Sequence, residues 1–545
     1  MLEPSGPVAI ELAELGMPYD DAVLHLMKRS SAAKLLTGPL PRAPMVTSGA
    51  ATTMALIGIT ALGLLLRLYR LDAASFWSDE AFSGYWIQRD LGFIWTDGLF
   101  IETTPPLYYM LLKIWAAVAG DGDFALRLFS AIASAITIPL VFLLAVQIAA
   151  VPAALVSALL FALAPMQIFY AQEARVYTLV SLFFALTLLG LLRFVRRSLA
   201  AVPAQGRIAA HAPLALFTAG AALLIYAHAT SVFTVAALSI CGGGMLLTRP
   251  AGREALPRFL LANLVVAVLA LPELYAIMHQ AGRFDLDWIS PPDLVAVLNL
   301  LNNLLIDPVT PQSLFRLSCI LSCGTVALLG LTLPFLRLER NAAVLLFGVP
   351  ILFLVAVIGL SFWSPFLIPR IIIWIGVPFS IIAGMALVSP APRLMRGGLA
   401  IALAACVALG LQGVYVRTLA DKQDWRGAMA KVLSHLSPDD MVVLGPGTSV
   451  LPMLRYAEGI FDDHKRAIFR WAPRPLPPDL YVHHRVQAPT ALTTEALAAA
   501  AHQGRRIWLL MPQYDWVRNA DAKLLEQMPP ATIDRSYAMI MLLSW

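Results

Sequence analysis

The sequence has few charged residues and few cysteines for its length. Only 13% of its 545 residues are Asp, Glu, Lys or Arg, whereas 59% are hydrophobic and the mean hydropathy is +0.74. A soluble globular domain carries about 25% charged residues, so the composition excludes that class. The four cysteines all lie in apolar stretches, and Cys319 and Cys323 lack the two further ligands of a structural metal site. We interpret all four as packing residues: Cys241, Cys319, Cys323 and Cys406.

The charge balance gives no basic surface for a nucleic acid. The net charge of +5 is small against 39 basic and 34 acidic residues. Short basic links between apolar blocks account for the excess, as expected of cytoplasmic loops in a membrane protein. We therefore predict no polynucleotide partner.

Long apolar blocks predict an all-α polytopic membrane protein of about eleven transmembrane helices. The segment Pro106–Ala119 has roughly 14 residues with Lys113 in its middle, where a span needs about 17 to 25, so we expect it to lie on the outer surface. With that assignment, the arginine clusters within 193–207, 249–258, 337–340 and 393–396 fall in the cytoplasm, in agreement with the positive-inside rule. The predicted spans are approximately 52–68, 126–147, 153–170, 176–194, 213–228, 230–247, 257–278, 313–336, 342–360, 371–388 and 397–415.

Three regions follow from this topology. Residues 1–50 carry no cleavable signal pattern and are predicted to be a cytoplasmic segment, and residues 51–415 form the transmembrane domain with a first outer loop at 70–125. Residues 416–545 are predicted to be a small extramembrane α/β domain on the outer side. A helical pattern begins at Asp424-Trp425-Arg426, and residues 441–444, 506–511 and 539–543 are typical of strands.

Most of the unusual polar residues fall on the outer face. An ionised side chain at the bilayer centre costs about 3 kcal/mol, so the adjacent carboxylates Asp79 and Glu80 belong at or outside the membrane surface. The other polar residues on this side are Glu102, Glu173, Arg175, His228, His279, Arg283, Asp285, Asp287 and Arg370.

An enzyme at the outer surface has no nucleotide sugar available, so an activated sugar must reach it through the bilayer on a lipid. A polyprenyl-phosphate sugar fits this requirement. Its tail occupies an apolar groove, its phosphate needs cationic partners, and the acceptor hydroxyl needs a carboxylate base. The outer face carries both residue types.

Several motifs, in order, carry a family resemblance. They are Phe76–Ala81 (FWSDEA), Glu102–Tyr109 (ETTPPLYY), Ala125–Ala131 (ALRLFSA) and Tyr170–Tyr177 (YAQEARVY), followed by Tyr226–His228, Ile368–Arg370 and Asp424–Arg426. Residues 52 to 430 resemble the C-type integral-membrane glycosyltransferases, and the glycosyltransferase family 39-like group in particular. That group is related to protein O-mannosyltransferases, to the lipid A aminoarabinose transferase and to rhizobial lipopolysaccharide galacturonic acid transferases.

The resemblance implies roles for the matching residues. Asp79 would be the catalytic base, and Glu80 would orient it or bind the acceptor. Arg370, which follows a proline at the start of a predicted span, is a candidate to hold the donor phosphate or only an anchor at the interface. Relatives often carry a basic residue, a histidine or a Glu-Lys pair at the two positions before the proline of the second motif. Thr103 and Thr104 stand there in this chain, which departs from the family's pattern at the positions that meet the donor phosphate or a metal in relatives.

The remaining site candidates have plainer alternatives. Arg127 could bind phosphate or only extend to the interface, and Glu173 and Arg175 could bind substrate or form a salt bridge within their loop. Further candidates for donor or substrate binding are Glu102, Tyr108, His228 and His279. We assign no metal site, although the resemblance leaves a divalent cation open.

The sequence thus predicts an inverting glycosyltransferase of the bacterial inner membrane with a periplasmic active site. The donor would be a sugar on undecaprenyl phosphate or a similar lipid, and the acceptor lipid A or lipopolysaccharide, another glycolipid, a polysaccharide or a protein. The alternatives are a secondary transporter and a non-catalytic envelope-assembly subunit.

Overall fold

A computed structural model describes most of the chain. The described residues are 49–200, 207–280, 289, 291–306, 312–417, 422–437, 439–444, 450–457, 468–471, 490–512, 528, 530, 532–534, 536 and 540–544. The predicted N-terminal segment and the candidates Arg283, Asp285 and Asp287 lie outside them.

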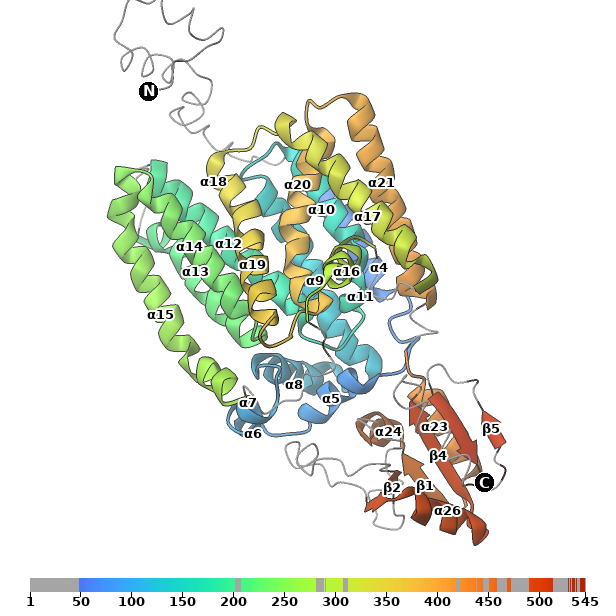
Figure 1. Ribbon diagram of the computed structural model, residues 1–545. Coiled ribbons are helices and arrows are strands. Elements are labelled where there is room, and N and C mark those ends of the chain that lie inside the picture. The colour runs from blue at the N-terminus through green and yellow to red at the C-terminus, as the bar shows by residue number, and fades with distance from the viewer. Residues whose placement is uncertain are drawn as a thin grey trace, which may run out of the picture. The chain divides into compact units, whose positions relative to one another are not determined.

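Helices dominate the described residues up to Arg417 (Figure 1). Those before Gln280 are α4 (Ala50–Leu68), α5 (Ser78–Trp86), α6 (Leu91–Trp95), α7 (Gly98–Ile101), α8 (Leu107–Ala119), α9 (Asp123–Ala145), α10 (Val151–Leu163), α11 (Pro165–Ala171), α12 (Tyr177–Ala200), α13 (Arg207–Ala227), α14 (Ser231–Leu247) and α15 (Pro250–Gln280). Those after it are α16 (Leu294–Leu305), α17 (Gln312–Thr332), η1 (Leu333–Phe335), α18 (Arg340–Ala343), η2 (Val344–Gly348), α19 (Val349–Ser361), η3 (Pro369–Ile375), α20 (Gly376–Val388), α21 (Arg393–Gln412) and η4 (Gly413–Arg417).

Eight helical segments of the described chain are long and apolar enough to cross a membrane, and the bent pair α10–α11 is a ninth candidate. The predicted spans at 213–228 and 230–247 correspond to the apolar part of α13 and to α14, which are shorter. A membrane protein is therefore confirmed, whereas the count of eleven stays a prediction. Cys241, Cys319 and Cys406 are buried, but Cys323 is exposed, so the packing prediction was wrong for that residue.

The predicted span 153–170 is not one helix. It breaks between α10 and α11 with a bend of 51°. Ala164 is extended at ψ 117°, as expected before a proline, and Pro165 opens α11. All seven residues of α11 are buried, and the helix leads directly into the turn that carries Glu173 and Arg175.

The loop predicted to be outer, residues 70–125, folds into the short helices α5, α6, α7 and α8 at one end of the helical bundle (Figure 1). Trp86 is fully buried and stacks between Phe93 and Tyr109, at 5.8 and 5.5 Å between ring centroids. The helix α8 has 13 residues, too few to span a bilayer. The loop is thus a packed structure that fixes the backbone around Asp79.

The C-terminal residues form a six-stranded sheet of order β3-β2-β1-β4-β6-β5. The strands are β1 (Met441–Leu444), β2 (Ile468–Trp471), β3 (Thr490–Leu492), β4 (Ile507–Pro512), β5 (Thr532–Asp534) and β6 (Ile540–Ser544), with helices α23 (Trp425–His435), α24 (Val450–Tyr456) and α26 (Thr494–His502). Strands β1 to β4 are parallel, and β6 pairs antiparallel with β4 and β5.

Alternation along the buried strands divides the core of this sheet into two layers. Val442 and Leu444 pack in one cluster with residues of α23 and α24, whereas Met441 and Val443 pack in another with residues of α26. The strands predicted at 441–444, 506–511 and 539–543 are present as β1, β4 and β6, while β2, β3 and β5 were not predicted.

Candidate active site

Asp79 and Glu80 lie in the first turn of α5 and point in different directions. Trp77 precedes the helix in an extended conformation, and consecutive residues of a helix are rotated by about 100°. The Asp79 side chain is 28% exposed, whereas that of Glu80 is completely buried. The pair therefore divides into one accessible carboxylate and one structural carboxylate.

Asp79 faces two arginines from distant parts of the chain. Arg370, in the first turn of η3, brings Nη1 within 3.2 Å of Asp79 Oδ2. Arg175, in the turn after α11, places Nη2 at 3.9 Å from the same oxygen and donates from Nη1 to the Asp79 carbonyl oxygen at 3.0 Å. One partly exposed carboxylate thus stands against two guanidinium groups, which leaves an excess of positive charge.

The surroundings keep these arginines charged and His228 neutral. Burial lowers the pKa of Arg175, but Tyr109, Tyr177 and Asp79 outweigh it and raise that pKa well above its usual value. Burial, with the charges of Arg370 and Arg175, lowers the pKa of His228 to about 4. His228 Nδ1 accepts the Thr230 backbone N–H at 3.3 Å, so the neutral ring carries its proton on Nε2. His228 therefore adds no charge to the site.

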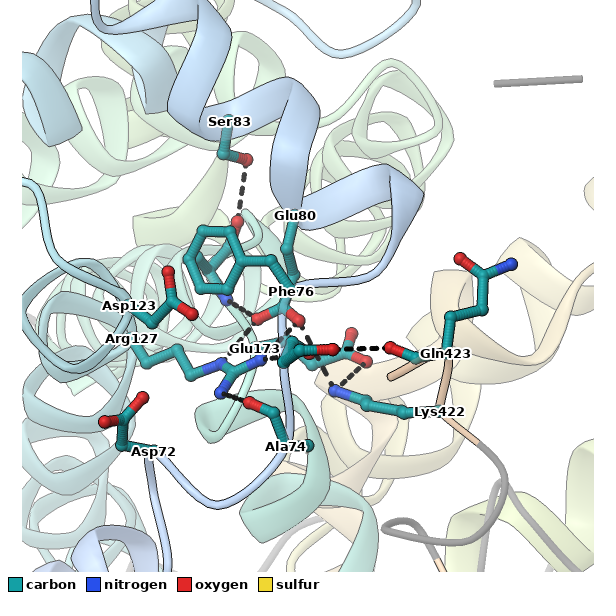
Figure 2. A network of polar contacts seen from close by, with 12 residues as sticks. Asp72, Ala74, Phe76, Glu80, Ser83, Asp123, Arg127, Glu173, Lys422 and Gln423 are labelled. Carbon is teal, nitrogen blue, oxygen red and sulfur yellow. Dashed lines mark hydrogen bonds and ion pairs between the residues drawn. The ribbon is translucent and has the colours of Figure 1, made fainter. Parts of the chain in front are cut away.

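Three groups compensate the burial of Glu80 with four contacts (Figure 2). Arg127 donates to both carboxylate oxygens at 2.7 Å, the Ala174 backbone N–H donates at 2.9 Å, and Lys422 Nζ lies 3.6 Å away. Burial alone would raise the pKa of Glu80, but the charges of Arg127 and Lys422 lower it to about 2. Glu80 is thus ionised and fixes α5 to α9 and to the Glu173 turn, which leaves no oxygen for an acceptor.

Arg127 uses all of its donors inside the chain. Besides the two bonds to Glu80, its Nη1 donates to the carbonyl oxygens of Leu71 and Ala74, and its Nη2 donates to that of Ser75. An arginine has five N–H groups, and all five are occupied. A contact of Arg127 with a donor phosphate stays a prediction that this geometry does not favour.

Glu173 pairs with Lys422 and not with Arg175, so the salt bridge considered within the loop is absent. Lys422 Nζ lies 3.1 Å from Glu173 Oε1, and Glu173 is 2% exposed. Burial and the nearby Glu80 raise the pKa of Glu173 against the opposing charge of Lys422. Sequence reasoning missed Lys422, because its only signal was a position two residues before Asp424-Trp425-Arg426.

The other predicted binding residues lie at different distances from this centre. Glu102 accepts the Thr104 backbone N–H at 3.2 Å, and Arg175 Nη2 donates to Thr104 Oγ1 at 3.4 Å, so this pair borders the site. Tyr108 is 1% exposed in the core under α5. His279 packs on the ring of Phe100 at 5.5 Å, and none of its described contacts is with Asp79.

Residues of the C-terminal region hold the loop before Asp79 from a second side. Asp123, at the start of α9, accepts from Arg455 Nε at 2.6 Å, Arg426 Nη2 at 2.7 Å and the Tyr456 hydroxyl at 2.5 Å. That hydroxyl also accepts the Phe76 backbone N–H at 2.6 Å. The Phe76 ring lies under two guanidinium groups, those of Arg127 at 4.9 Å and Arg455 at 4.3 Å. None of these contacts was predicted.

A small open pocket adjoins the buried charges. It is lined by Arg70, Leu71, Ala74, Arg127, Phe169, Gln172, Val414, Tyr415 and Lys422. Within the described residues, no three His, Cys, Asp or Glu side chains gather to hold a metal ion. Glu173, the carboxylate nearest this pocket's Lys422, already has that lysine as its cationic partner.

Comparison with known proteins supports this interpretation of the fold. The family model for dolichyl-phosphate-mannose-protein mannosyltransferase matches residues 103–275. The crystal structure of ArnT from Cupriavidus metallidurans in the apo state matches with a TM-score of 0.57 and 13% identity, covering 91% of this chain and 98% of that chain. ArnT bound to undecaprenyl phosphate matches over the same shares with a TM-score of 0.56 and 13% identity. No curated protein sequence matches the chain significantly.

The structural likeness establishes the fold, and the family model covers the segment that carries Thr104, Arg127, Glu173 and Arg175. The fold that the ordered motifs predicted is thereby confirmed: the chain has the ArnT-like fold of the C-type integral-membrane glycosyltransferases, and residues 103–275 match the mannosyltransferase family model.

Proposed function

We propose that this protein is an inverting transferase that moves one monosaccharide from a polyprenyl phosphate to a hydroxyl group of an envelope acceptor. The observation that carries the proposal is the group of Asp79, Arg370 and Arg175. A partly exposed carboxylate next to two charged guanidinium groups, at the end of a helical bundle, combines a base with a cationic phosphate site.

The chemistry needs only these two functions. The acceptor oxygen attacks the anomeric carbon, the bond from that carbon to the phosphate oxygen breaks, and its electron pair leaves with the phosphate. Asp79 takes the proton of the attacking hydroxyl. The two arginines stabilise the charge that develops on the leaving phosphate, so no general acid is required.

The charge at the site matches this donor. A sugar phosphodiester carries one negative charge, and one carboxylate against two guanidinium groups leaves one positive charge uncompensated. Since His228 stays neutral, it can donate a hydrogen bond from Nε2 without changing this balance. ArnT, which shares the fold, has been crystallised with undecaprenyl phosphate, and this supports a lipid phosphate as the carrier.

The buried charges next to the site would position the base and would not react. Glu80 and Arg127 fix the start of α5, and the Ala174 N–H bond to Glu80 sets the turn that carries Arg175. We place the reaction on the outer face of the bacterial inner membrane, because the predicted topology exports both the first loop and residues 416–545. Lipid A or lipopolysaccharide, another glycolipid, a polysaccharide and a protein remain the candidate acceptors.

The test is transfer by the purified protein in lipid nanodiscs. It would be incubated with undecaprenyl-phosphate-linked mannose, glucose, aminoarabinose and galacturonic acid in turn, together with envelope extract from a strain that lacks the gene. We expect one donor to release undecaprenyl phosphate and to add one sugar mass to one acceptor in the extract. Uptake of a soluble solute by proteoliposomes without consumption of any donor would instead identify a transporter.

A further inference from the structure

The segment that follows the last membrane helix enters the core of the site. Lys422 contacts Glu80 and Glu173, and the neighbouring Gln423 is 5% exposed. The Gln423 carbonyl oxygen accepts from Ser75 Oγ at 2.5 Å, and its side-chain oxygen accepts from Ser78 Oγ at 3.3 Å. Trp425 is fully buried, and its backbone N–H donates to Ser75 Oγ at 3.1 Å. These residues therefore pack against the extended segment that leads into Asp79.

Lys422 completes the charge balance of a buried cluster. Figure 2 shows Arg127 and Lys422 approaching the Glu80 carboxylate from different sides, with Glu173 beside Lys422. Glu80 and Glu173 are 0% and 2% exposed, and Arg127 is the only other cation with a described contact to either carboxylate. Without Lys422, two buried carboxylates would share the single charge of Arg127. An unpaired buried charge is strongly unfavourable, so the cluster would rearrange.

A short chain of contacts connects this cluster to the base. Lys422 ties Glu173 to Glu80, Glu80 accepts from the Ala174 N–H, and the next residue, Arg175, donates to the Asp79 carbonyl oxygen. A displacement of the 173–175 turn therefore changes the distance between Arg175 and Asp79. We propose that Lys422 is a positioning residue, through which the segment leading into the C-terminal domain sets the geometry of the catalytic carboxylate and its arginine. This inference rests on the proposed function for the identity of the reaction.

A competing role for Lys422 is direct binding of an anion. Lys422 also lines the small open pocket described above, together with the buried Arg127 and the exposed Arg70. A phosphate in that pocket could reach the ammonium group. The two roles differ in one respect: a positioning lysine is needed only while Glu173 is charged, whereas a phosphate-binding lysine is needed regardless of Glu173.

Three variants separate the two roles: Lys422→Met, Glu173→Gln and the double variant. The first readout is hydrogen exchange of the peptides around residues 71–86 and 172–177 in the full chain without substrate. We expect Lys422→Met to raise the exchange rate in both peptides. The exchange rate of the double variant should return to within about threefold of that of Glu173→Gln, because the double variant also removes the Glu173 carboxylate that Lys422→Met leaves unpaired. This readout does not depend on any sugar donor.

The second readout is turnover of the donor that the nanodisc assay identifies. We expect Lys422→Met to lower kcat by about 100-fold with little change in KM, as a displaced base would, and the double variant to recover most of that loss. Wild-type exchange in Lys422→Met would overturn the inference, and so would a double variant that stays as impaired as Lys422→Met. If exchange behaves as expected but no donor is consumed by the wild type, the positioning role stands and the proposed function has failed.

Discussion

Replacing Glu80 with Gln tests the contribution of the buried ion pair between Glu80 and Arg127, next to the proposed base Asp79. Gln has nearly the shape of a protonated Glu, so the change removes the charge and leaves the packing. The fold lowers the pKa of Glu80 from 4.5 to about 2, which corresponds to about 3 kcal/mol of stabilisation for the ionised side chain at neutral pH. We expect Glu80→Gln to lower the local stability of the loop by about that amount at pH 7.

The pH dependence follows from the direction of the shift. A carboxyl group with a lowered pKa in the folded state contributes its full stabilisation above its ordinary pKa, and loses it as the pH falls toward the folded value. The stability difference between wild type and Glu80→Gln should therefore be constant above about pH 5.5, shrink below pH 4.5, and fall under about 1 kcal/mol at pH 2.5.

The assay is native-state hydrogen exchange of the peptide around residues 75–86 in detergent, with each rate divided by the intrinsic rate at the same pH. Asp121→Asn is the matched control, because that exposed carboxylate lies in the same loop and its side chain contacts only Gln88 among its described partners, at 3.4 Å. Equal protection in wild type and Glu80→Gln at pH 7 would refute the reasoning. A difference that stays constant down to pH 2.5 would refute it as well.

Two further predictions concern the phosphate site and the C-terminal attachment. Arg370→Gln removes one of the two cations beside Asp79, so KM for the lipid-phosphate donor should rise at least about tenfold while the thermal midpoint changes little; an unchanged KM would exclude Arg370 as a phosphate ligand. Asp123→Asn weakens the bonds from Arg426, Arg455 and Tyr456, so the C-terminal region should lose about 2 kcal/mol of protection against proteolysis. Wild-type protease resistance in that variant would show that the attachment contributes nothing.

The main residues of the site could be predicted from the sequence because they lie in recognisable motifs. Asp79, Arg175 and Arg370 were all candidates before the fold was known, and the structure brings them together although Arg370 lies 291 residues after Asp79. Length was sufficient to recognise α8 as too short for a span. Pro165 was a visible signal for the break between α10 and α11, but the apolar run around it predicted a continuous helix.

The sequence could not show which of two adjacent acids is buried. Asp79 and Glu80 have the same surroundings in the chain, and only the tertiary position of Arg127 makes Glu80 structural. Lys422 and Asp123 were missed for a similar reason. A lone lysine after a span and an aspartate at a helix start are common surface features, and their partners lie more than 240 residues away in the chain.

The most direct test of the catalytic assignment is the turnover of Asp79→Asn with the identified donor, measured beside Asp121→Asn. Asn keeps the size of the side chain but cannot accept the proton, so kcat should fall by about 1,000-fold while Asp121→Asn stays close to wild type. The purified Asp79→Asn protein should retain the wild-type exchange pattern around residues 172–177. Near-normal turnover in Asp79→Asn would contradict the account.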